Sequence, residues 1–392
     1  MTASVTRCIF GWLSLVLLAG CFSHPDLKPG RTRFRQPSVL VPAQVIGSHF
    51  LVQSKWDKHG PWNFLIDTGS SVTLVSSDFA KFYATERPAI EAPSVRVKGA
   101  NGNSSVMRAV TLRRLDLGGT RFDNIDALIG DLSDISQHLG IKIDGILGFP
   151  LFRETIFTLD YPSSQLLLLP SNTTAQPAGS TIKFNNDQRT PLIPVQLGDT
   201  TVFLLIDSGS DGPFELNPAG LNWSYAVPPR PGATVGTLAG DRTQHVGRLE
   251  QSIEIGRFEF KKPIVDLTDQ LSSIGGEILK NFSVTFDQAH NRVTFSRPDG
   301  KVVEMPPKLS AGLAFAKGPT YWRVVAVVPG SPAEEGGVQV GDLVTRINGE
   351  SITNWPLNRY EAYVRHSSEI VFTFLDGSKE RPVVVPIFQL VP

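Results

Sequence analysis

Short apolar runs alternate with turn-forming residues along most of this chain. Residues 94–98, 110–117, 165–169 and 201–206 are such runs, and Gly, Asn, Asp and Pro separate them from their neighbours. This pattern is typical of β-strands joined by turns. Helical periodicity is scarce, and 78–83 is the stretch for which we expect one or two turns of helix. The pattern therefore predicts a mostly β protein.

A four-residue motif occurs twice, each time directly after an apolar run. Asp67-Thr68-Gly69-Ser70 follows 64–66, and Asp207-Ser208-Gly209-Ser210 follows 203–206. Average residue frequencies give one such motif by chance in roughly one chain of this length in a hundred. Two copies in matching contexts therefore indicate duplication. Two aspartates, each in a glycine turn at the end of a strand, predict a paired-carboxylate site.

A second element recurs downstream of each aspartate. Aligning Asp160 with Asp287 also aligns Gly148 with Gly275, and each glycine ends an apolar run. The interval from Asp160 to Asp287 is shorter than the interval between the two motif aspartates. The second unit is therefore shorter between its motifs. Repetition at this period indicates two duplicated domains rather than a solenoid.

This set of motifs resembles the aspartic peptidase superfamily, and most of all the bacterial retropepsin-like proteins with two lobes in one chain. The resemblance covers about residues 38–304. It implies two related β lobes forming one cleft, at 38–172 and 181–304, with a linker at 171–180 between them. It also implies that Asp67 and Asp207 form a catalytic dyad that shares one proton and activates water. No metal or other cofactor is implied.

The motif positions beside the aspartates support the dyad in the resembled family: Thr68, Gly69, Ser70, Ser208, Gly209 and Ser210. The two glycines let the main chain turn sharply and approach the carboxyl groups. The hydroxyl that follows each aspartate bonds across to the other lobe, and the hydroxyl of the fourth residue donates to the outer carboxylate oxygen. Local turn capping is an alternative for all four hydroxyls.

Three further segments are candidates for substrate contact. Glycine-rich tips at Gly99-Ala100 and Gly236-Thr237 lie about thirty residues after the aspartates, which resembles the paired flaps of retropepsins; ordinary β-turns are the alternative. Asp211 follows the second motif, where retropepsins have an aspartate that pairs with a basic residue and contacts substrate backbone. The Arg-Asn pair of retropepsins is missing here, because Phe-Pro and Gly-Glu occupy its two positions. Asp211 is therefore either a ligand for substrate amides or a solvated turn residue.

The C-terminal segment, 305–392, begins with Met-Pro-Pro and then resembles a bacterial PDZ domain. The resemblance rests on Pro-Gly-Ser-Pro-Ala at 329–333, Gly-Asp-Leu-Val at 341–344 and Ile-Asn-Gly at 347–349. The loop formed by Gly312, Leu313, Ala314 and Phe315 resembles the loop that holds a peptide's terminal carboxylate while the peptide adds a strand. A small β-rich cap without a ligand is the alternative.

The N-terminus, 1–20, resembles a lipoprotein signal peptide. Arg7 precedes an apolar stretch at 9–19 that is too short to span a bilayer, and Leu-Ala-Gly-Cys at 18–21 resembles a lipobox. This implies cleavage before Cys21, lipidation of that residue, and sorting to the bacterial outer membrane facing the periplasm. A simple signal peptide with a chance cysteine is the alternative. Residues 21–37 are expected to be a tether, whose basic stretch at 28–35 is either solvated or in contact with anionic headgroups.

Composition narrows the remaining choices. The 37 basic and 37 acidic residues balance, so nothing suggests a nucleic-acid partner. Cys8 and Cys21 are the two cysteines, so no disulfide is expected in the mature chain, and the seven histidines show no metal-ligand spacing. We expect a membrane-anchored aspartic endopeptidase whose PDZ domain binds a peptide or the substrate. The alternatives are a non-catalytic envelope peptide-binding scaffold with the same fold, or an enzyme that acts on another polymer.

Overall fold

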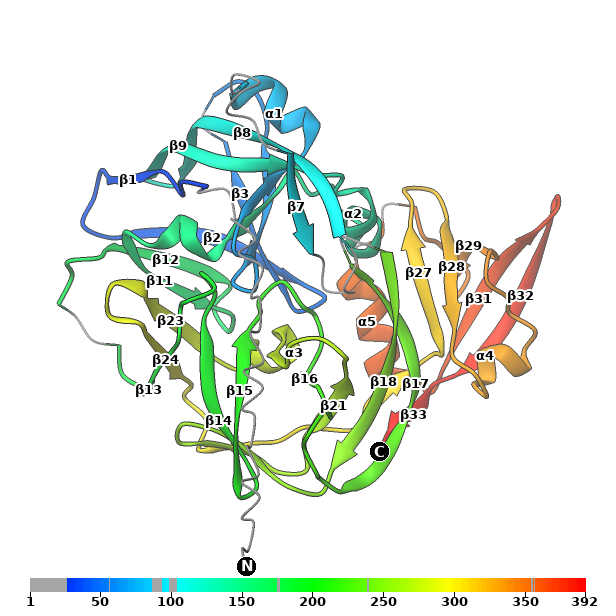
Figure 1. Cartoon of the computed structure of the whole chain (residues 1–392). Coiled ribbons are helices and arrows are strands. Elements are labelled where there is room, and N and C mark those ends of the chain that lie inside the picture. Colours follow the sequence, from blue (N-terminus) through cyan, green and yellow to red (C-terminus); the bar gives the residue numbers. More distant parts are fainter. Residues whose placement is uncertain are drawn as a thin grey trace, which may run out of the picture.

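The computed structural model describes residues 27–392 except 56, 87–93, 99–103, 175–176, 238–239, 354 and 356. In this part of the chain most residues are in β-strands, as the apolar pattern predicts. Two β lobes pack together, and a smaller C-terminal domain lies against one side of them (Figure 1). None of the described helices is long and apolar enough to cross a membrane. The expected signal peptide and Cys21 lie outside the described residues.

The largest sheet extends from the first lobe into a layer shared by both lobes, with the order β13-β24-β23-β11-β12-β2-β3-β4-β10-β5-β9-β8-β6 and with β1 and β7 beside it. Its strands are β1 (Arg31–Phe34), β2 (Val39–Ile46), β3 (His49–Ser54), β4 (Trp62–Asp67), β5 (Thr73–Val75), β6 (Ala84–Glu86), β7 (Ser94–Lys98), β8 (Ser104–Leu117), β9 (Thr120–Ile129), β10 (Gly145–Gly148), β11 (Thr155–Asp160), β12 (Gln165–Pro170), β13 (Ser180–Lys183), β23 (Ser283–Asp287) and β24 (Arg292–Ser296).

The shared layer shows the duplication directly. β11 from the first lobe pairs antiparallel with β23 from the second, and Thr158 lies opposite Thr285. Their hydroxyl oxygens are 2.8 Å apart. These two threonines are also equivalent in the sequence repeat, so the axis that relates the lobes passes between them. The two strands that the repeat aligns thus join the lobes.

The second lobe is a ten-stranded sheet among the described residues, with the order β17-β18-β21-β16-β22-β15-β14-β19-β20-β25. Its strands are β14 (Leu192–Leu197), β15 (Thr200–Ile206), β16 (Phe214–Leu216), β17 (Tyr225–Thr237), β18 (Gly240–Leu249), β19 (Ile253–Ile255), β20 (Phe258–Phe260), β21 (Ile264–Leu267), β22 (Ser273–Ile274) and β25 (Val302–Val303). The long hairpin β17–β18 forms the edge of the lobe nearest the C-terminal domain (Figure 1).

The C-terminal domain has its own sheet, ordered β27-β28-β29-β31-β32 with β30 beside β29, and a separate pair β26–β33. Its strands are β26 (Lys308–Ser310), β27 (Leu313–Lys317), β28 (Trp322–Val327), β29 (Leu343–Ile347), β30 (Glu350–Ser351), β31 (Glu369–Asp376), β32 (Lys379–Pro386) and β33 (Phe388–Val391). The α-helices of the described chain are α1 (Ser77–Tyr83), α2 (Ser133–Leu139), α3 (Gly276–Leu279), α4 (Pro332–Glu335) and α5 (Leu357–His366).

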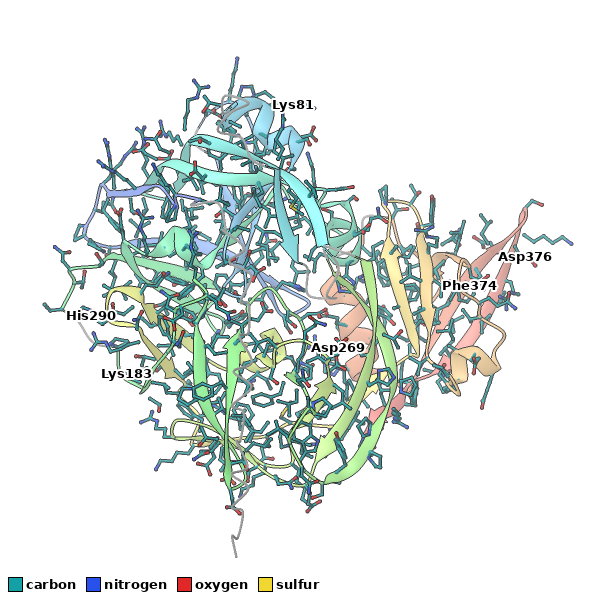
Figure 2. All side chains as sticks on the ribbon, viewed as in Figure 1. Lys81, Lys183, Asp269, His290, Phe374 and Asp376 are labelled. Atoms are coloured by element: carbon teal, nitrogen blue, oxygen red, sulfur yellow. The ribbon has the colours of Figure 1, made fainter. Side chains whose placement is uncertain are left out.

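The largest cluster of buried apolar residues lies in the lobes, and the C-terminal domain has a separate one. One buried cluster runs through both lobes, and its aromatic rings include Phe157 stacked on Phe286 with centroids 4.8 Å apart. A second cluster fills the C-terminal domain around Trp322 and Phe372. Figure 2 labels two residues of β31, of which Phe374 is buried and Asp376 is exposed near the hairpin tip. Each unit therefore has its own core.

A third apolar cluster fixes the C-terminal domain against the second lobe. Val246 and Ile264 from the lobe pack against Val328, Leu390 and Val391 from the domain, and all five are buried. Around them, the guanidinium of an arginine in β18 donates to backbone carbonyls at 262, 305, 306 and 392. The domain is therefore docked on the base of the β17–β18 hairpin.

The tether expected at 21–37 is wrong for its described part. Leu27 is buried, the Lys28 N–H donates to Asp126 Oδ2 at 2.8 Å, and β1 pairs with β9. Without β1, this edge of β9 would expose unpaired backbone N–H and C=O groups, and the pairing with β1 satisfies them. Residues from Leu27 onward therefore belong to the first lobe. The described residues of 171–179 lie between β12 and β13, and the last residue of the expected linker, Ser180, begins β13.

Candidate active site

Equivalent strands carry the two aspartates to equivalent places. β4 ends at Asp67, and its parallel neighbour β10 places Gly148 directly opposite. In the second lobe β15 pairs with β22 in the same direction, and the Asp207 N–H donates to the Ile274 carbonyl at 3.0 Å. Each strand ends in an apolar run followed by a glycine turn; the run is mostly buried in β4, whereas in β15 only Leu204 and Ile206 are buried. The sequence pattern that suggested a carboxylate at each strand end is therefore followed by the backbone.

The two turns face each other across the lobe interface, and the glycines show how closely they approach. A methyl group on Gly69 would lie 2.6 Å from Asp207 Cγ, and one on Gly209 would lie 2.6 Å from Asp67 Oδ1. Neither distance can accommodate a side chain, so only glycine fits at these positions. Each aspartate thus packs against the turn of the opposite lobe, and the duplicated motif forms one site.

Reciprocal hydrogen bonds connect the two turns. The Thr68 hydroxyl donates to the Ile206 carbonyl at 2.6 Å and accepts from the Ser208 N–H at 3.0 Å. The Ser208 hydroxyl donates to the Ile66 carbonyl at 2.7 Å and accepts from the Thr68 N–H at 3.0 Å. Both side chains are fully buried. The hydroxyls therefore bridge the lobes, as the resemblance implies, and hold the separation of the two aspartates.

Ser70 and Ser210 are not where the resemblance predicts. The Ser70 hydroxyl donates to the Val72 carbonyl at 2.8 Å, and the Ser210 hydroxyl donates to Glu215 Oε1 at 2.9 Å. Each also accepts from the N–H two residues on, which is the local turn capping that Ser commonly performs. Donation to the aspartate carboxylates is therefore wrong for both serines, and the capping alternative describes them.

Burial sets the electrostatics of the aspartate pair. Desolvation raises the pKa of Asp67, and desolvation together with the neighbouring Asp67 charge raises the pKa of Asp207 well above its usual range. The Gly209 N–H donates to Asp207 Oδ1 at 2.9 Å and partly offsets this. Asp67 Oδ1 is buried and has no hydrogen-bond partner among the described residues. Such a pair retains a proton at pH values where an isolated carboxyl group has lost it.

Asp211 is neither solvated nor unpaired. Its Oδ2 lies 3.1 Å from His138 Nε2, which comes from α2 in the opposite lobe, and both side chains are about a quarter exposed. Burial alone would raise the pKa of Asp211, but His138, His49 and Lys308 hold it well below its usual range. The prediction of a solvated turn residue is therefore wrong. The basic partner that the missing Arg-Asn put in doubt is present as a histidine.

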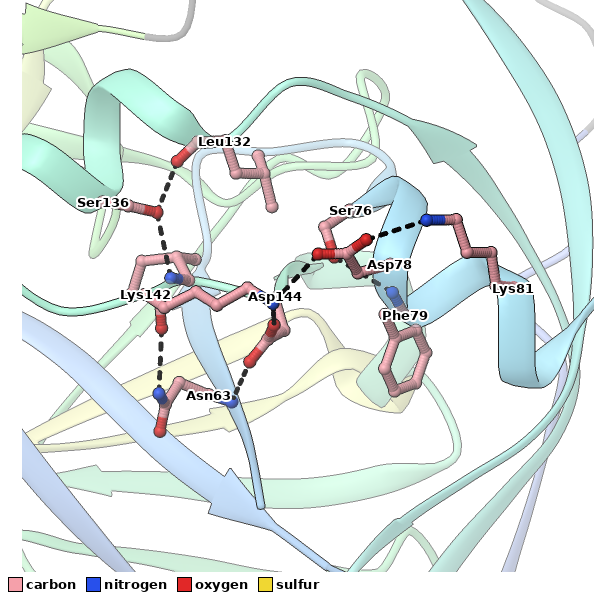
Figure 3. Close-up of polar contacts among 10 residues, drawn as sticks. Asn63, Ser76, Asp78, Phe79, Lys81, Leu132, Ser136, Lys142 and Asp144 are labelled. Carbon is pink, nitrogen blue, oxygen red and sulfur yellow. Dashed lines mark hydrogen bonds and ion pairs between the residues drawn. The ribbon is translucent and has the colours of Figure 1, made fainter. Parts of the chain in front are cut away.

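A polar network positions α2, which carries His138. Asp144 accepts from the Asn63 N–H at 2.9 Å, and Ser136 Oγ accepts from the Ile143 N–H at 3.0 Å (Figure 3). Lys142 pairs with Asp78 at the start of α1, at 3.1 Å. The network connects α1, α2 and the start of β4 within the first lobe. His138 therefore projects from a fixed helix rather than from a loose loop.

The expected substrate-contacting tips are described only in part. Gly99 and Ala100 lie outside the described residues. Gly236 and Thr237 are the last residues of β17, where Thr237 pairs with Gly240 in a β-hairpin, and their side chains are not described. Both hairpins, β7–β8 and β17–β18, therefore exist as strand pairs. Their role as flaps stays a prediction.

The loop expected to hold a carboxylate has the geometry of a tight glycine turn. Gly312 has φ +75°, and a methyl group there would lie 2.6 Å from the Ser331 Cβ. Leu313 and Phe315 are buried, Ala314 is half-buried, and the Phe315 ring lies 5.6 Å from that of Tyr360 in α5. β27 is the first strand of its sheet order. The loop, an edge strand and a helix therefore border one hollow.

Comparison with known families agrees with this division. Residues 52–151 match an aspartyl protease family, and residues 323–374 match a PDZ domain family. The chain is thus mostly β, with an aspartyl protease domain followed by a C-terminal PDZ domain. The first match covers the Asp67 lobe, and the second lobe is recognised through the repeat. No curated protein matches the chain.

Two solved structures show partial likeness. A PDZ domain protein from Parabacteroides distasonis is 16% identical, with a TM-score of 0.19, and the match covers 21% of each chain. The HtrA3 PDZ domain bound to a phage-derived ligand (FGRWV) is 18% identical, also with a TM-score of 0.19, over 21% of this chain and 88% of that one. Likeness at this level carries no argument about function.

Several site residues had no signal in the sequence. His49, His138 and Tyr161 are distant from both motifs, yet His49 and His138 lie beside Asp211, and the charges of both aspartates act on Tyr161. Burial lowers the pKa of His49 and that of Lys317, the latter to about 8. A search for metal-ligand spacing could not find them. Within the described chain, no group of three or more His, Cys, Asp or Glu residues could hold a metal ion.

Proposed function

We propose that the chain is an aspartic endopeptidase that uses Asp67 and Asp207 as one catalytic dyad. The observation that carries this proposal is the close approach of each aspartate to the glycine of the opposite turn, inside a symmetric frame of buried hydroxyl bonds. A scaffold that only bound peptides would not need two half-buried carboxyl groups to share one site. Burying a charge without a partner is costly, and proteins retain such pairs mainly at functional sites.

The chemistry follows from the raised pKa values. When two half-buried carboxyl groups lie side by side, losing the second proton is harder than losing the first, so the dyad holds a single shared proton at the working pH. Aspartic proteases are the standard example of this coupling. The ionised member accepts a proton from water, and the protonated member donates to the scissile carbonyl oxygen.

Cleavage by the soluble mature chain tests the proposal. The chain from residue 22 onward would be incubated with a diverse peptide library, and products identified by mass spectrometry with and without a statine-type inhibitor. We expect internal peptide bonds to be cut and the inhibitor to suppress the cuts. A complete absence of cuts at every pH between 3 and 8, from a folded protein, would favour the non-catalytic scaffold instead.

We also propose that the protein is anchored in the bacterial outer membrane by lipid on Cys21 and faces the periplasm. The Leu-Ala-Gly-Cys sequence at 18–21 supports this, and acyl chains contribute about 0.8 kcal/mol per buried methylene. Cys21→Ser should release the protein from the membrane fraction or leave it unprocessed. Wild-type protein that is wholly soluble and carries no acyl group by mass spectrometry would contradict the anchor.

The PDZ domain is proposed to bind a peptide or the substrate through Gly312, Leu313, Ala314 and Phe315. Support comes from the glycine turn at φ +75° and from the edge strand that follows it. Backbone amides in such a loop can hold a terminal carboxylate, while a strand adds to β27. Titration of the inactive full-length protein with labelled peptides, as free acids and as amides, would measure this binding.

A further inference from the structure

The hollow beside β27 is shared between the two domains. It holds about 340 Å³ and is lined by the PDZ loop, β27 and α5 on one side. Its other side is formed by residues of both protease lobes, namely Ser48, His138, Asp211 and Glu277. Asp211 is four residues after Asp207, in the turn that forms half of the dyad. The hollow therefore lies between the PDZ domain and the lobes, beside the turn that carries Asp207.

A chain of contacts marks the junction. Lys317, the last residue of β27, donates to the backbone carbonyl of His138, and the His138 ring contacts Asp211. Lys308, at the start of β26, pairs with Glu277 at 3.0 Å. The PDZ domain, the first lobe and the second lobe thus meet at these side chains. Together with the apolar docking cluster, the contacts fix the groove relative to the dyad.

Strand pairing sets the direction of any bound peptide. A peptide whose C-terminal carboxylate lies at the loop, beside Gly312, would add antiparallel to β27 at the edge that pairs with no strand of the described chain. Its upstream residues then pass Lys317 and reach His138 and Asp211. In Figure 1, β27 and α5 lie on the face of the PDZ domain that is turned toward α2 and the β17–β18 hairpin. The upstream part of such a peptide would therefore leave the groove beside α2 and the β17–β18 hairpin.

The lining suits the end of a polypeptide. Leu313, Phe315, Tyr360 and Val364 give an apolar wall that accommodates a hydrophobic terminal side chain. The charged side chains of the hollow are Lys280, Lys308, Lys317, Arg365, Asp211, Glu277 and Glu361. Positive charge is in slight excess among them, which favours a carboxylate over an internal, neutral segment of chain.

We propose that the PDZ groove and the catalytic site form one binding channel, so that the protein cuts chains close to a free, apolar C-terminus. β27 spans five residues, or about 17 Å, and four residues from Asp211 to Asp207 span at most about 14 Å. Adding the width of His138, the scissile bond lies within about twelve residues of the carboxylate. This inference names a substrate class for the proposed peptidase and rests on that activity.

Bivalent ligands test the channel without requiring a known substrate. A statine-containing hexapeptide would be extended by Gly/Ser spacers of four lengths, the shortest a dipeptide and the longest about twice the expected span, each ending in Leu-Val as free acid or amide. Binding to the full mature protein would be measured by calorimetry. We expect the free acid to bind at least about tenfold more tightly than the amide at the best of the shorter spacers, because the second contact is intramolecular. The advantage should decline at the longest spacer.

A matched pair of variants locates the effect. Val364→Glu places a carboxylate against the groove, whereas Val340→Glu makes the same change at a side chain that is 66% exposed elsewhere in the domain. We expect Val364→Glu to remove the difference between acid and amide, and Val340→Glu to preserve it. Thermal unfolding of both variants checks that they fold. If Val364→Glu does not fold, the spacer series on the wild-type protein still decides.

The outcomes separate this inference from the proposed function. If the untailed statine peptide binds and is competitive with cleavage, but acid and amide tails bind equally at every spacer, the channel is wrong and the peptidase stands. If the untailed peptide does not bind and no library peptide is cut, the peptidase is wrong and the channel falls with it. A free-acid advantage that grows steadily up to the longest spacer would place the groove away from the dyad and would also overturn the channel.

Discussion

The turn after Asp67 and the turn after Asp207 have the same backbone but different surroundings. In both, the N–H of the fourth motif residue bonds to the aspartate carbonyl, and the carbonyl of that serine accepts from Phe149 in one lobe and Gly276 in the other. One residue further the equivalence ends, because Ser71 stands in the first lobe and Asp211 in the second. Asp211 faces His138 and the PDZ domain.

This difference distinguishes the residues that hold the two aspartates together from the residues that face the C-terminal domain. The residues that control the approach of the two carboxyl groups are the same or chemically equivalent in both lobes. The reason is that each of them contacts the turn of the opposite lobe across the axis. The residues next to them have no such partner and are free to differ. The asymmetry lies where the hollow beside β27 meets the lobes. The aspartate pair is therefore symmetric, whereas its surroundings are not.

The largest effect should come from breaking the symmetric part. Asp67→Asn or Asp207→Asn leaves one carboxyl group that cannot both accept and donate a proton, so each should lower kcat by at least about 10³-fold. Product formation from a cleavable library peptide would measure this. Asp299→Asn is the matched control, because that side chain is 82% exposed. Either folded single variant with more than a tenth of wild-type activity would contradict the shared dyad.

The same variants have a distinctive effect on stability. Folding raises the pKa of Asp207, so the folded state holds its proton more tightly than the unfolded state does. Its stabilising contribution is present at low pH and is lost as pH rises through the folded pKa. Asp207→Asn should therefore match the wild type near pH 3 and be more stable at pH 7. Urea unfolding at both pH values would show it, and a less stable variant at pH 7 would contradict the burial argument.

The next effect should come from the bridge between the turns. Thr68→Val or Ser208→Ala leaves a buried carbonyl and a buried N–H unpaired, at about 1–3 kcal/mol each. Each variant should therefore lose about 2–6 kcal/mol of unfolding free energy and most of its activity. Thr201→Val is the control, because its hydroxyl bonds to Gln196 at the surface and should contribute less than about 0.5 kcal/mol. If Thr68→Val lost no more unfolding free energy than the Thr201→Val control, the bridge between the turns would not contribute to stability.

Local patterns predicted the fold and the symmetric part of the site. β7 occupies the expected 94–98, and β12 and β15 exceed the expected runs by one residue each, because period-two patterns and flanking turns are local signals. The dyad frame was predictable since the motif occurs twice. β8 begins six residues earlier than expected, and α2 was missed because Ile135 and Leu139 are its only buried residues.

Long-range contacts explain most of what the sequence could not show. His138 lies 73 residues from Asp211 and comes from the other lobe, so no spacing indicates the pair. The position of the PDZ domain depends on apolar residues in β18, β21 and β33 that look like ordinary strand residues. The serine hydroxyls were misplaced for another reason. Each hydroxyl could donate a hydrogen bond either to an aspartate carboxylate or to a group in its own turn, and the sequence does not indicate which acceptor it uses.

A smaller effect should come from the asymmetric part. The folded pKa of Asp211 is depressed, so its contribution is present above the unfolded pKa of about 3.9 and is lost as pH falls. Asp211→Asn should therefore cost about 1 kcal/mol above pH 4, given a partly exposed ion pair, and converge with the wild type near pH 2. Urea unfolding as a function of pH measures the difference. Curves that stay parallel down to pH 2 would mean that the pair with His138 contributes nothing.

The smallest effect separates the two serines and tests how far this site departs from the resembled family. Ser70→Ala removes a local turn bond, whereas Ser210→Ala also leaves Glu215 without its hydroxyl donor, so we expect the second to cost more, though less than about 1.5 kcal/mol. Neither hydroxyl bonds to an aspartate. The acid limb of the kcat/KM profile should therefore stay within about 0.3 pH units of the wild type in both variants. A donor to an ionised carboxylate lowers its pKa, so an acid limb that moves upward by a full unit would show that the serines contact the dyad after all.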